Sequence, residues 1–263
     1  SIFLYSLNFE DIIFTLIFGV ALLYTKKDHA RTTINLIMNL QSVSMLIVKW
    51  IMRFAPVAVF ALMVQVSAHT GFSTFLGLFM YVITVLVGLL LLMLFYVTII
   101  LIFTKEKPLD FMRKIKEPQL LAFSTSSSAA VIPLSIQTAE EELKVKKEIS
   151  RFIIPIGATV NMDGTALYQV VATVFLAQVF GIDLSFVSVL LIAAITVAAS
   201  IGAPAAPGVG IIILGTILNS VGIPLTGIAL ILGVDRILDM TRTAVNVTGD
   251  LTAVKIFNKI IKI

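Results

Sequence analysis

Apolar residues recur along this chain in runs of about 20, the length at which a helix can cross a bilayer. The pattern predicts spans at Phe9–Tyr24, Phe75–Phe103 and Phe152–Phe180, and a longer helix over Thr33–Val66. A last helix is expected from about Gly227 to Val254. These runs predict an all-α polytopic protein of the cell membrane, plasma or inner.

Two apolar segments carry an interruption that one simple crossing would not contain. Ser124–Ser128 interrupts the first, and Ser200–Gly210, with two prolines and three glycines, interrupts the second. Such tips are tolerated inside a membrane when protein surrounds them or when they line a water-filled cavity. We therefore expect two re-entrant helical hairpins, at about residues 108–148 and 186–222.

The basic residues support this layout. Clusters at residues 26–31, 105–116, 144–151 and 255–262 hold 15 of the 19 Lys and Arg. All four lie on the cytoplasmic side, with a cytoplasmic C-terminus, only if both interrupted segments return to the side they entered. Hairpins that open from opposite faces also indicate an inverted repeat. An ordinary span with poor charge bias stays open as the alternative for the first hairpin.

One face of the last helix is polar. Asp235, Asp239, Arg242, Asn246 and Asp250 fall within an arc of roughly 80° on a helix. Charged side chains are costly in a membrane and are found turned inward around a polar site. The rest of the chain is therefore expected to build a cavity opposite this face, for a charged solute and ions.

A second polar motif, Asn161-Met-Asp-Gly-Thr165, lies in the middle of the predicted span Phe152–Phe180. Gly164 is flexible, and Asn and Asp side chains compete with the backbone for hydrogen bonds, so the helix is expected to break there. An unwound turn exposes carbonyls beside a carboxylate, an arrangement that coordinates Na⁺ in transporters. A kinked helix with a satisfied polar pair is the alternative.

Composition excludes several other classes. The net charge of +4 comes from basic loops and gives no sign of a nucleic-acid partner. The chain has no cysteine for a disulfide, a thiolate metal site or a nucleophile. An intramembrane aspartyl protease is a remote alternative, because Val247 replaces a glycine of that motif and Arg242 keeps Asp239 charged. A gated channel would need a continuous pore. We expect no enzyme.

Three motifs together resemble those of the glutamate transporter family, the dicarboxylate/amino acid:cation symporters. They are Ser124–Ser128, Asn161–Thr165 and Asp239-x-x-Arg-Thr-x-x-Asn-x-x-Gly-Asp250, and their order and spacing also match. The resemblance implies a prokaryotic member that lacks its first three helices. It implies scaffold and trimerisation helices in residues 1–70, a transport domain in residues 71–263, and a homotrimer in a lipid bilayer.

The resemblance also implies how an amino acid would be held. Asp239 would bind its α-amino group, Arg242 its side-chain carboxylate and Asn246 its α-carboxylate, with Thr165 and Thr243 assisting. The two hairpin tips would enclose it. The implied substrate-binding residues are Ser126, Ser127, Ser128, Thr165, Ala206, Gly210, Asp239, Arg242, Thr243 and Asn246.

Three sodium sites are implied in the same way. The first would use Asn161, Asn246, Asp250 and the carbonyl of Gly157. The second would use Thr159 and the carbonyls of Ser200, Ile201 and Ala203, and the third Asn161 and Asp163 with ligands from the missing helices. Two positions depart from the pattern of archaeal relatives. Ser126 replaces an arginine whose charge Arg236 would supply, and Ala203 replaces a threonine, so only a carbonyl ligand is left there.

The expected function is sodium-coupled symport of acidic amino acids by alternating access. Arg242 demands an anion, while Asp239 suits an ammonium group and repels a plain dicarboxylate. Aspartate and glutamate are both open. Proton coupling, and symport of neutral amino acids or C4-dicarboxylates, are the alternatives within the family.

Overall fold

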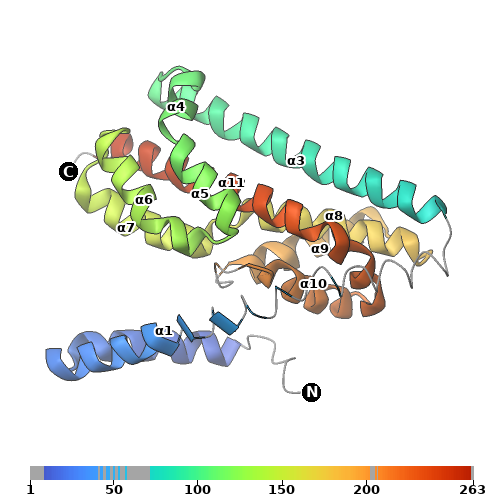
Figure 1. Cartoon of the computed structure of the whole chain (residues 1–263), viewed down its shortest axis with the longest axis horizontal. Helices are drawn as coiled ribbons and strands as arrows, with labels where there is room; N and C mark the ends of the chain where they lie inside the picture. Colours follow the sequence, from blue (N-terminus) through green and yellow to red (C-terminus); the bar gives the residue numbers. More distant parts are fainter. Residues whose placement is uncertain are drawn as a thin grey trace. The chain divides into compact units, whose positions relative to one another are not determined.

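The computed structural model describes residues 9–40, 42–43, 46–47, 50, 53, 57, 72–201, 205 and 207–261. Within these residues the chain forms helices and no strands, as expected for an all-α protein. Two compact units are separated along the sequence, Ser1–Ala58 and Val59–Ile263. Figure 1 labels the helices in chain order.

The first unit contains α1, Phe9–Tyr24, whose bounds match the predicted span. A second helix covers residues 27–40, and the described residues up to 57 are also helical. The basic cluster at 26–31, expected as a loop, is thus mostly helical. Asp28 in the first turn favours this start, because the helix dipole attracts negative charge there. The predicted end of this helix at Val66 lies outside the described residues.

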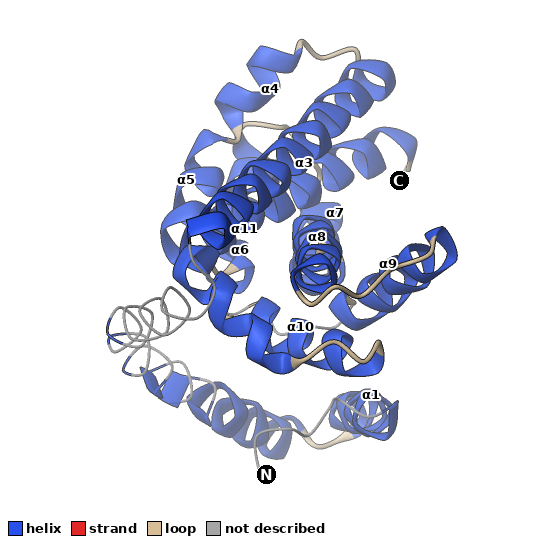
Figure 2. Ribbon diagram, turned by 90° about the vertical axis from the view of Figure 1, so that its right-hand side faces the viewer, coloured by secondary structure: helices blue, strands red, loops and turns tan. Residues whose placement is uncertain are grey.

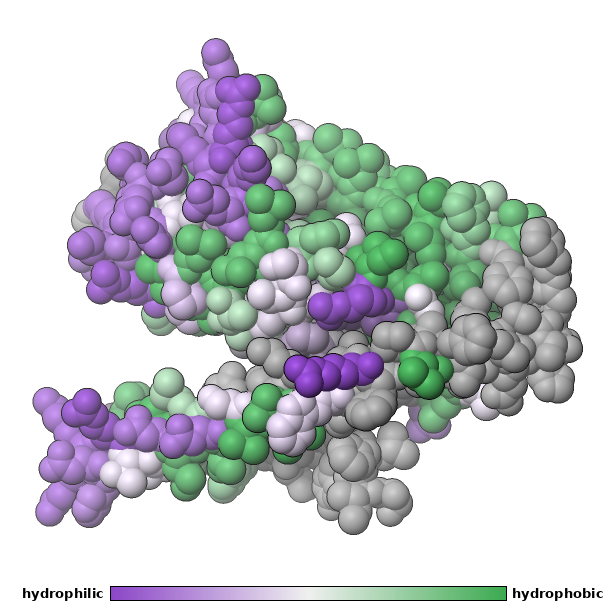
Figure 3. All heavy atoms as spheres, in the orientation of Figure 1, coloured by the Kyte–Doolittle hydropathy of each residue, from purple (hydrophilic) through white to green (hydrophobic). Residues whose placement is uncertain are grey.

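The first described element of the second unit is α3, Phe72–Thr104, a single helix of 33 residues. Much of its apolar surface is exposed, as at Leu90, Leu91 and Phe95. Among the described residues, its segment Leu76–Thr104 is the one stretch long and apolar enough to cross a membrane. Figure 3 shows apolar residues along α3 and hydrophilic residues gathered at the end that carries α4 and the C-terminus.

The first hairpin is made of α5, Lys116–Thr125, and α6, Ser128–Glu141, which pack against each other. Ser126 adopts a left-handed conformation with φ of 52°, and Ser127 caps α6 by accepting from the Ala130 amide. The serine-rich segment therefore forms the turn, as predicted from the sequence.

A short helix precedes this hairpin and corrects the expected basic loop at 105–116. It is α4, Pro108–Lys114. Pro108 stands at its first turn, Asp110 follows, and Arg113 and Lys114 lie in its last turn, which suits the dipole at both ends.

Helix α7, Lys147–Val160, and helix α8, Asp163–Val179, are separated only by Asn161 and Met162. The predicted break is thus present but shorter than the five-residue motif. The helix resumes at Asp163 because a carboxylate in the first turn is favourable for the dipole.

The second interrupted segment forms α9, Phe186–Ser200, and α10, Val209–Ser220. Gly208, with φ of 79°, precedes α10 in a conformation that suits glycine. After the 3₁₀ turn Leu225–Gly227, α11 runs from Ile228 to Ile260. It passes the predicted end at Val254, because basic residues in the last turns favour continuation of the helix.

Helix α11 is the centre of this unit and packs against α3, α5, α6, α7 and α8 (Figure 2). Its apolar residues join two buried clusters. Leu238 packs in a cluster with Leu89 of α3 and Tyr168 of α8, while Leu251 packs in another with Phe111 of α4. The polar face of α11 is buried together with them.

Candidate functional site

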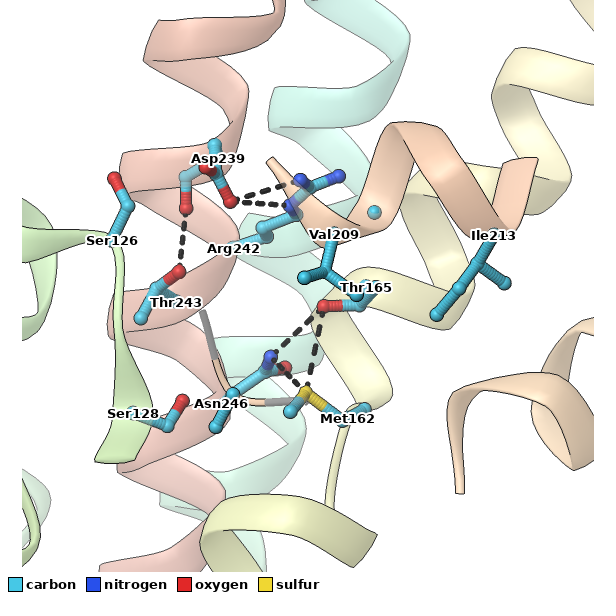
Figure 4. Close-up of a pocket in the computed structure, with 12 residues that line it drawn as sticks. Ser126, Ser128, Met162, Thr165, Val209, Ile213, Asp239, Arg242, Thr243 and Asn246 are labelled. Atoms are coloured by element: carbon cyan, nitrogen blue, oxygen red, sulfur yellow. Dashed lines mark hydrogen bonds and ion pairs between the residues drawn. The ribbon is translucent and has the colours of Figure 1, made fainter. Parts of the chain in front are cut away.

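A small cavity lies where both hairpins meet α11 (Figure 4). Its volume is about 20 Å³, on the order of one water molecule. Polar groups from four elements line it together with a few apolar side chains. The lining residues are Ser126, Ser128, Met162, Thr165, Ala205, Val209, Gly210, Ile213, Asp239, Arg242, Thr243 and Asn246.

The predicted inward face of α11 is confirmed. Asp235, Asp239, Arg242, Asn246 and Asp250 are all buried, and none exposes more than 7% of its surface. Burial of so many charged groups is costly unless they pair with one another or with a ligand. The interactions of these side chains therefore indicate what the site can bind.

Arg242 is the most buried of the charged residues, with 1% exposure. Its Nε and Nη2 donate to Asp239 Oδ1 at 3.1 and 2.9 Å, and its Nη1 lies 3.9 Å from Asp235 Oδ1. The guanidinium carbon stands 4.2 Å from the centroid of the Tyr168 ring. Among the described residues, Arg242 Nη1 has no hydrogen-bond partner, and neither has Asp235 Oδ1. The guanidinium can therefore donate a hydrogen bond to a further anionic group.

The second hairpin closes the cavity through three hydrogen bonds. Ser127 Oγ donates to the Ala205 carbonyl at 2.7 Å, so the two tips touch. The Gly208 amide donates to Asp239 Oδ2 at 3.1 Å. On the other side, Gln169 Nε2 of α8 donates to the Gly210 carbonyl, also at 3.1 Å.

The break between α7 and α8 connects the cavity to Asp250. Asn161 Nδ2 donates to Asp250 Oδ1 at 3.0 Å and to the Asn246 carbonyl at 3.1 Å. A Cβ added at Gly157 would lie 2.5 Å from Asp250 Oδ1, so the α7 backbone approaches this carboxylate closely. In the structure the Asn161 amide donates to this buried carboxylate, and a turn of that amide would present an oxygen beside it, an arrangement that suits a monovalent cation such as Na⁺.

Comparison with known proteins fits this geometry, since residues 10–260 match the sodium:dicarboxylate symporter family. The chain belongs to this family. The resemblance inferred from three motifs is thereby confirmed, and so is the expectation that the chain is a transporter family member rather than an enzyme. As a member of the symporter family it is a membrane protein.

Animal amino acid transporters are among the similar proteins. The neutral amino acid transporter B(0) of Mus musculus is 40% identical over 246 residues, which cover 91% of this chain and 44% of that protein. The excitatory amino acid transporter of Caenorhabditis elegans is 36% identical over 91% of this chain and 48% of its own length. Excitatory amino acid transporter 1 of Ambystoma tigrinum is 37% identical, with 91% and 44% covered. The chain spans less than half of the length of each of these relatives.

Most substrate-binding residues expected of a symporter of this family come together. Eight of the ten line the cavity. Ser127 instead links the two tips, and Ala206 lies outside the described residues. Sequence reasoning missed the apolar lining at Met162, Val209 and Ile213, for which adjacency to the polar motifs was the only signal.

The three implied sodium sets differ in how closely their members meet. Of the first set, Gly157, Asn161 and Asp250 are in contact, while Asn246 takes part through its carbonyl. The Asn246 side chain faces the cavity, where Oδ1 accepts from the Gly164 amide at 2.7 Å.

No hydrogen bond joins the described members of the second set, Thr159, Ser200 and Ile201, to one another. The hydroxyl groups of Thr159 and Ser200 donate within their own helices, Ile201 is exposed, and Ala203 lies outside the described residues. In the third set, Asp163 meets a residue that sequence reasoning missed. Tyr96 of α3 donates its hydroxyl to Asp163 Oδ2.

Two further observations bear on charge in the site. Arg236 is exposed and forms no ion pair with any described residue. No group of three or more His, Cys, Asp or Glu gathers in the described part of the symporter chain as a multivalent metal site would require.

Proposed function

We propose that this chain forms the substrate- and cation-binding part of a sodium-coupled symporter of acidic amino acids. The observation that carries the proposal is Arg242, a buried guanidinium that faces the cavity and whose Nη1 has no hydrogen-bond partner among the described residues. A guanidinium binds a carboxylate through two parallel hydrogen bonds. Aspartate or glutamate supplies such a carboxylate from its side chain, in addition to its α-carboxylate, and a neutral amino acid does not.

Binding requires a rearrangement, because a cavity of about 20 Å³ cannot hold an amino acid. Arg242 and Asp239 now neutralise each other. In the proposed complex, Arg242 turns toward the side-chain carboxylate of the substrate, with Asp235 still beside it, and Asp239 accepts the α-amino group. The second hairpin must also move, since the Gly208 amide occupies Asp239 Oδ2.

Sodium is proposed as the co-transported ion. Asp250 supplies the charge of the first site, and Asn161, Asn246 and the Gly157 carbonyl supply neutral oxygens, after the Asn161 amide turns its oxygen toward the ion. The second site, at Thr159, Ser200, Ile201 and Ala203, and the third, at Asn161 and Asp163, complete the proposal. Proton uptake by a buried carboxylate is the alternative form of coupling.

The proposed cycle is alternating access. The two hairpins are taken as re-entrant and related as an inverted repeat, and they move with α7, α8 and α11 as one transport domain of residues 71–263. Residues 1–70 serve as scaffold in a homotrimer. The basic residues of α4 and of the end of α11 support a cytoplasmic position for the C-terminus.

Transport of neutral amino acids is the second candidate, because a relative at 40% identity carries that name. Arg242 separates the two candidates, since a neutral ligand leaves its charge paired only with carboxylates of the protein. In that case Asp239 would stay bound to Arg242 and would not be available to an ammonium group.

The test is uptake of radiolabelled L-aspartate into liposomes that hold the full-length protein, under an inward gradient of Na⁺ or of H⁺. Uptake driven by Na⁺ alone and blocked by excess L-glutamate supports the proposal. Uptake driven only by H⁺ removes the sodium sites. If serine or succinate is carried and aspartate is not, the roles given to Asp239 and Arg242 are wrong.

A further inference from the structure

Helix α3 carries an inward-facing phenol in an otherwise apolar stretch. Tyr96 exposes 5% of its surface, whereas its neighbours Leu94 and Phe95 expose more than half of theirs. A buried tyrosine hydroxyl normally finds a hydrogen-bond partner, because an unpaired one is costly. The identity of that partner therefore indicates what Tyr96 does.

The partner is Asp163, the first residue of α8. Tyr96 Oη donates to Asp163 Oδ2 at 2.5 Å, which is the short distance typical of a hydroxyl bound to a carboxylate. Asp163 is an exposed residue. Among the described residues, the phenol is therefore the hydrogen-bond donor that holds this carboxylate in one orientation, and it leaves Oδ1 available to a ligand.

The same phenol lies against the backbone of α11. A Cβ added at Gly249 would stand 2.7 Å from Tyr96 Oη and would also crowd the Asn161 amide. Asn161 in turn donates to Asp250. Tyr96, Asn161 and Gly249 thus meet where a methyl group has no room, so the phenol is an integral part of the helix break.

We propose that Tyr96 is a positioning residue for Asp163 and thereby sets the affinity of the cation site at the break between α7 and α8. The inference rests on the proposed sodium coupling. Without the phenol, the exposed carboxylate turns toward water, and each bound cation must first immobilise it. Helix α3 then contributes to ion binding although it contributes no residue to the substrate cavity.

The test compares Tyr96→Phe with Tyr81→Phe in the purified full-length protein. Tyr81 is a matched control, because it is on the same helix, is 2% exposed, and stacks its ring on Phe175 of α8. The thermal midpoint is followed as NaCl replaces choline chloride at constant ionic strength. Binding to the folded state raises that midpoint with ligand concentration, so its Na⁺ dependence reports affinity without transport.

Loss of one charge-assisted hydrogen bond predicts that Tyr96→Phe needs roughly ten-fold more Na⁺ for half of the shift. Tyr81→Phe should match the unaltered protein. In an Asp163→Asn background, Tyr96→Phe should have no further effect on Na⁺ dependence, since it acts through that carboxylate. L-aspartate affinity at saturating Na⁺ should be unchanged.

Three results would overturn the inference. If Tyr96→Phe lowers the midpoint equally with and without Na⁺, the phenol is a packing residue only. If the unaltered protein shows no Na⁺ response, sodium coupling fails, and this inference fails with it. A normal response of the unaltered protein with an unshifted Tyr96→Phe overturns the role of Tyr96 alone.

Discussion

Substitution of Arg242 is the most direct test of whether its positive charge binds the side-chain carboxylate of the substrate. In Arg242→Lys, a positive charge stays between Asp235 and Asp239, but the planar fork that makes two parallel hydrogen bonds is lost. In Arg242→Gln, the charge is lost as well. We expect both variants to bind acidic amino acids more weakly, with glutamine the more severe change.

The size of the expected loss in affinity follows from the hydrogen bonds that Arg242 would make to the substrate instead of to Asp239. Arg242 now makes two hydrogen bonds to Asp239, at 3.1 and 2.9 Å, and one such bond to a charged group contributes about 1.5–3 kcal/mol. Lysine loses one of them, which weakens aspartate binding about 10- to 150-fold. Glutamine removes a buried charge partner, at about 2–5 kcal/mol, or roughly 30- to 5,000-fold.

The assay is competition of unlabelled L-aspartate and L-serine against a labelled substrate at fixed, saturating Na⁺. Arg236→Gln is the control, because Arg236 is an exposed arginine on the same helix. It should leave both affinities unchanged. Aspartate binding by Arg242→Gln within about three-fold of the unaltered protein would refute the reasoning. Arg242→Lys guards against misfolding, since it keeps a cation between the two buried aspartates.

Three further perturbations follow from individual contacts. Ser127→Ala removes the bond to Ala205 and should speed amide hydrogen exchange at the second tip by about five-fold. Gly157→Ala would push a methyl group into Asp250 and should weaken Na⁺ binding by about ten-fold or more, as measured by the Na⁺ dependence of thermal stability. Burial alone would raise the pKa of Glu106. Hydrogen bonds and positive charges from Lys114 and Lys255 outweigh this effect, so the pKa of Glu106 lies below its ordinary value. Its stabilisation is complete above the unfolded pKa and is lost as pH falls through the folded pKa, so acidification should lower the melting temperature less in Glu106→Gln.

Each of these has a matched control in the chain. Ser124→Ala removes a hydroxyl that donates to the Leu121 carbonyl within α5, and Gly215→Ala adds a methyl group at an ordinary contact distance of 3.5 Å from Ile228. Glu117→Gln alters an exposed carboxylate close to Glu106 in sequence. Equal effects in a variant and its control would contradict the contact on which that prediction rests.

The helices and the polar face of α11 were predictable from two independent signals that agree. One is the helical periodicity of the residues, and the other is the free-energy cost of exposing polar side chains to lipid. Asp239, Arg242 and Asn246 repeat at helical spacing, and polar or charged side chains are stable within a membrane only when they face the protein interior. α4 was missed although Pro108 and Asp110 are ordinary start signals, because a cluster of basic residues was interpreted as a loop.

Tertiary pairing was not predictable from periodicity. Tyr96 lies 67 residues from Asp163, and spacing along a helix cannot identify a partner on another element. The sequence also assigned Asp239 and Arg242 to opposite ends of a substrate, whereas in the structure they bind each other. That pairing depends on which conformation the site adopts, and no motif encodes it.

The two interactions of Asn246 have a consequence for the binding of the amino acid and of the ion. Its side-chain oxygen accepts from the Gly164 amide at the cavity, while its backbone carbonyl accepts from Asn161, which holds Asp250. In the proposed symporter, one residue is thus shared by the solute site and the ion site. By linkage, any factor by which Na⁺ tightens binding of the amino acid is equal to the factor by which the amino acid tightens binding of Na⁺. A substitution at Asn246 would then change both affinities and their coupling together, so neither could evolve independently of the other through this position.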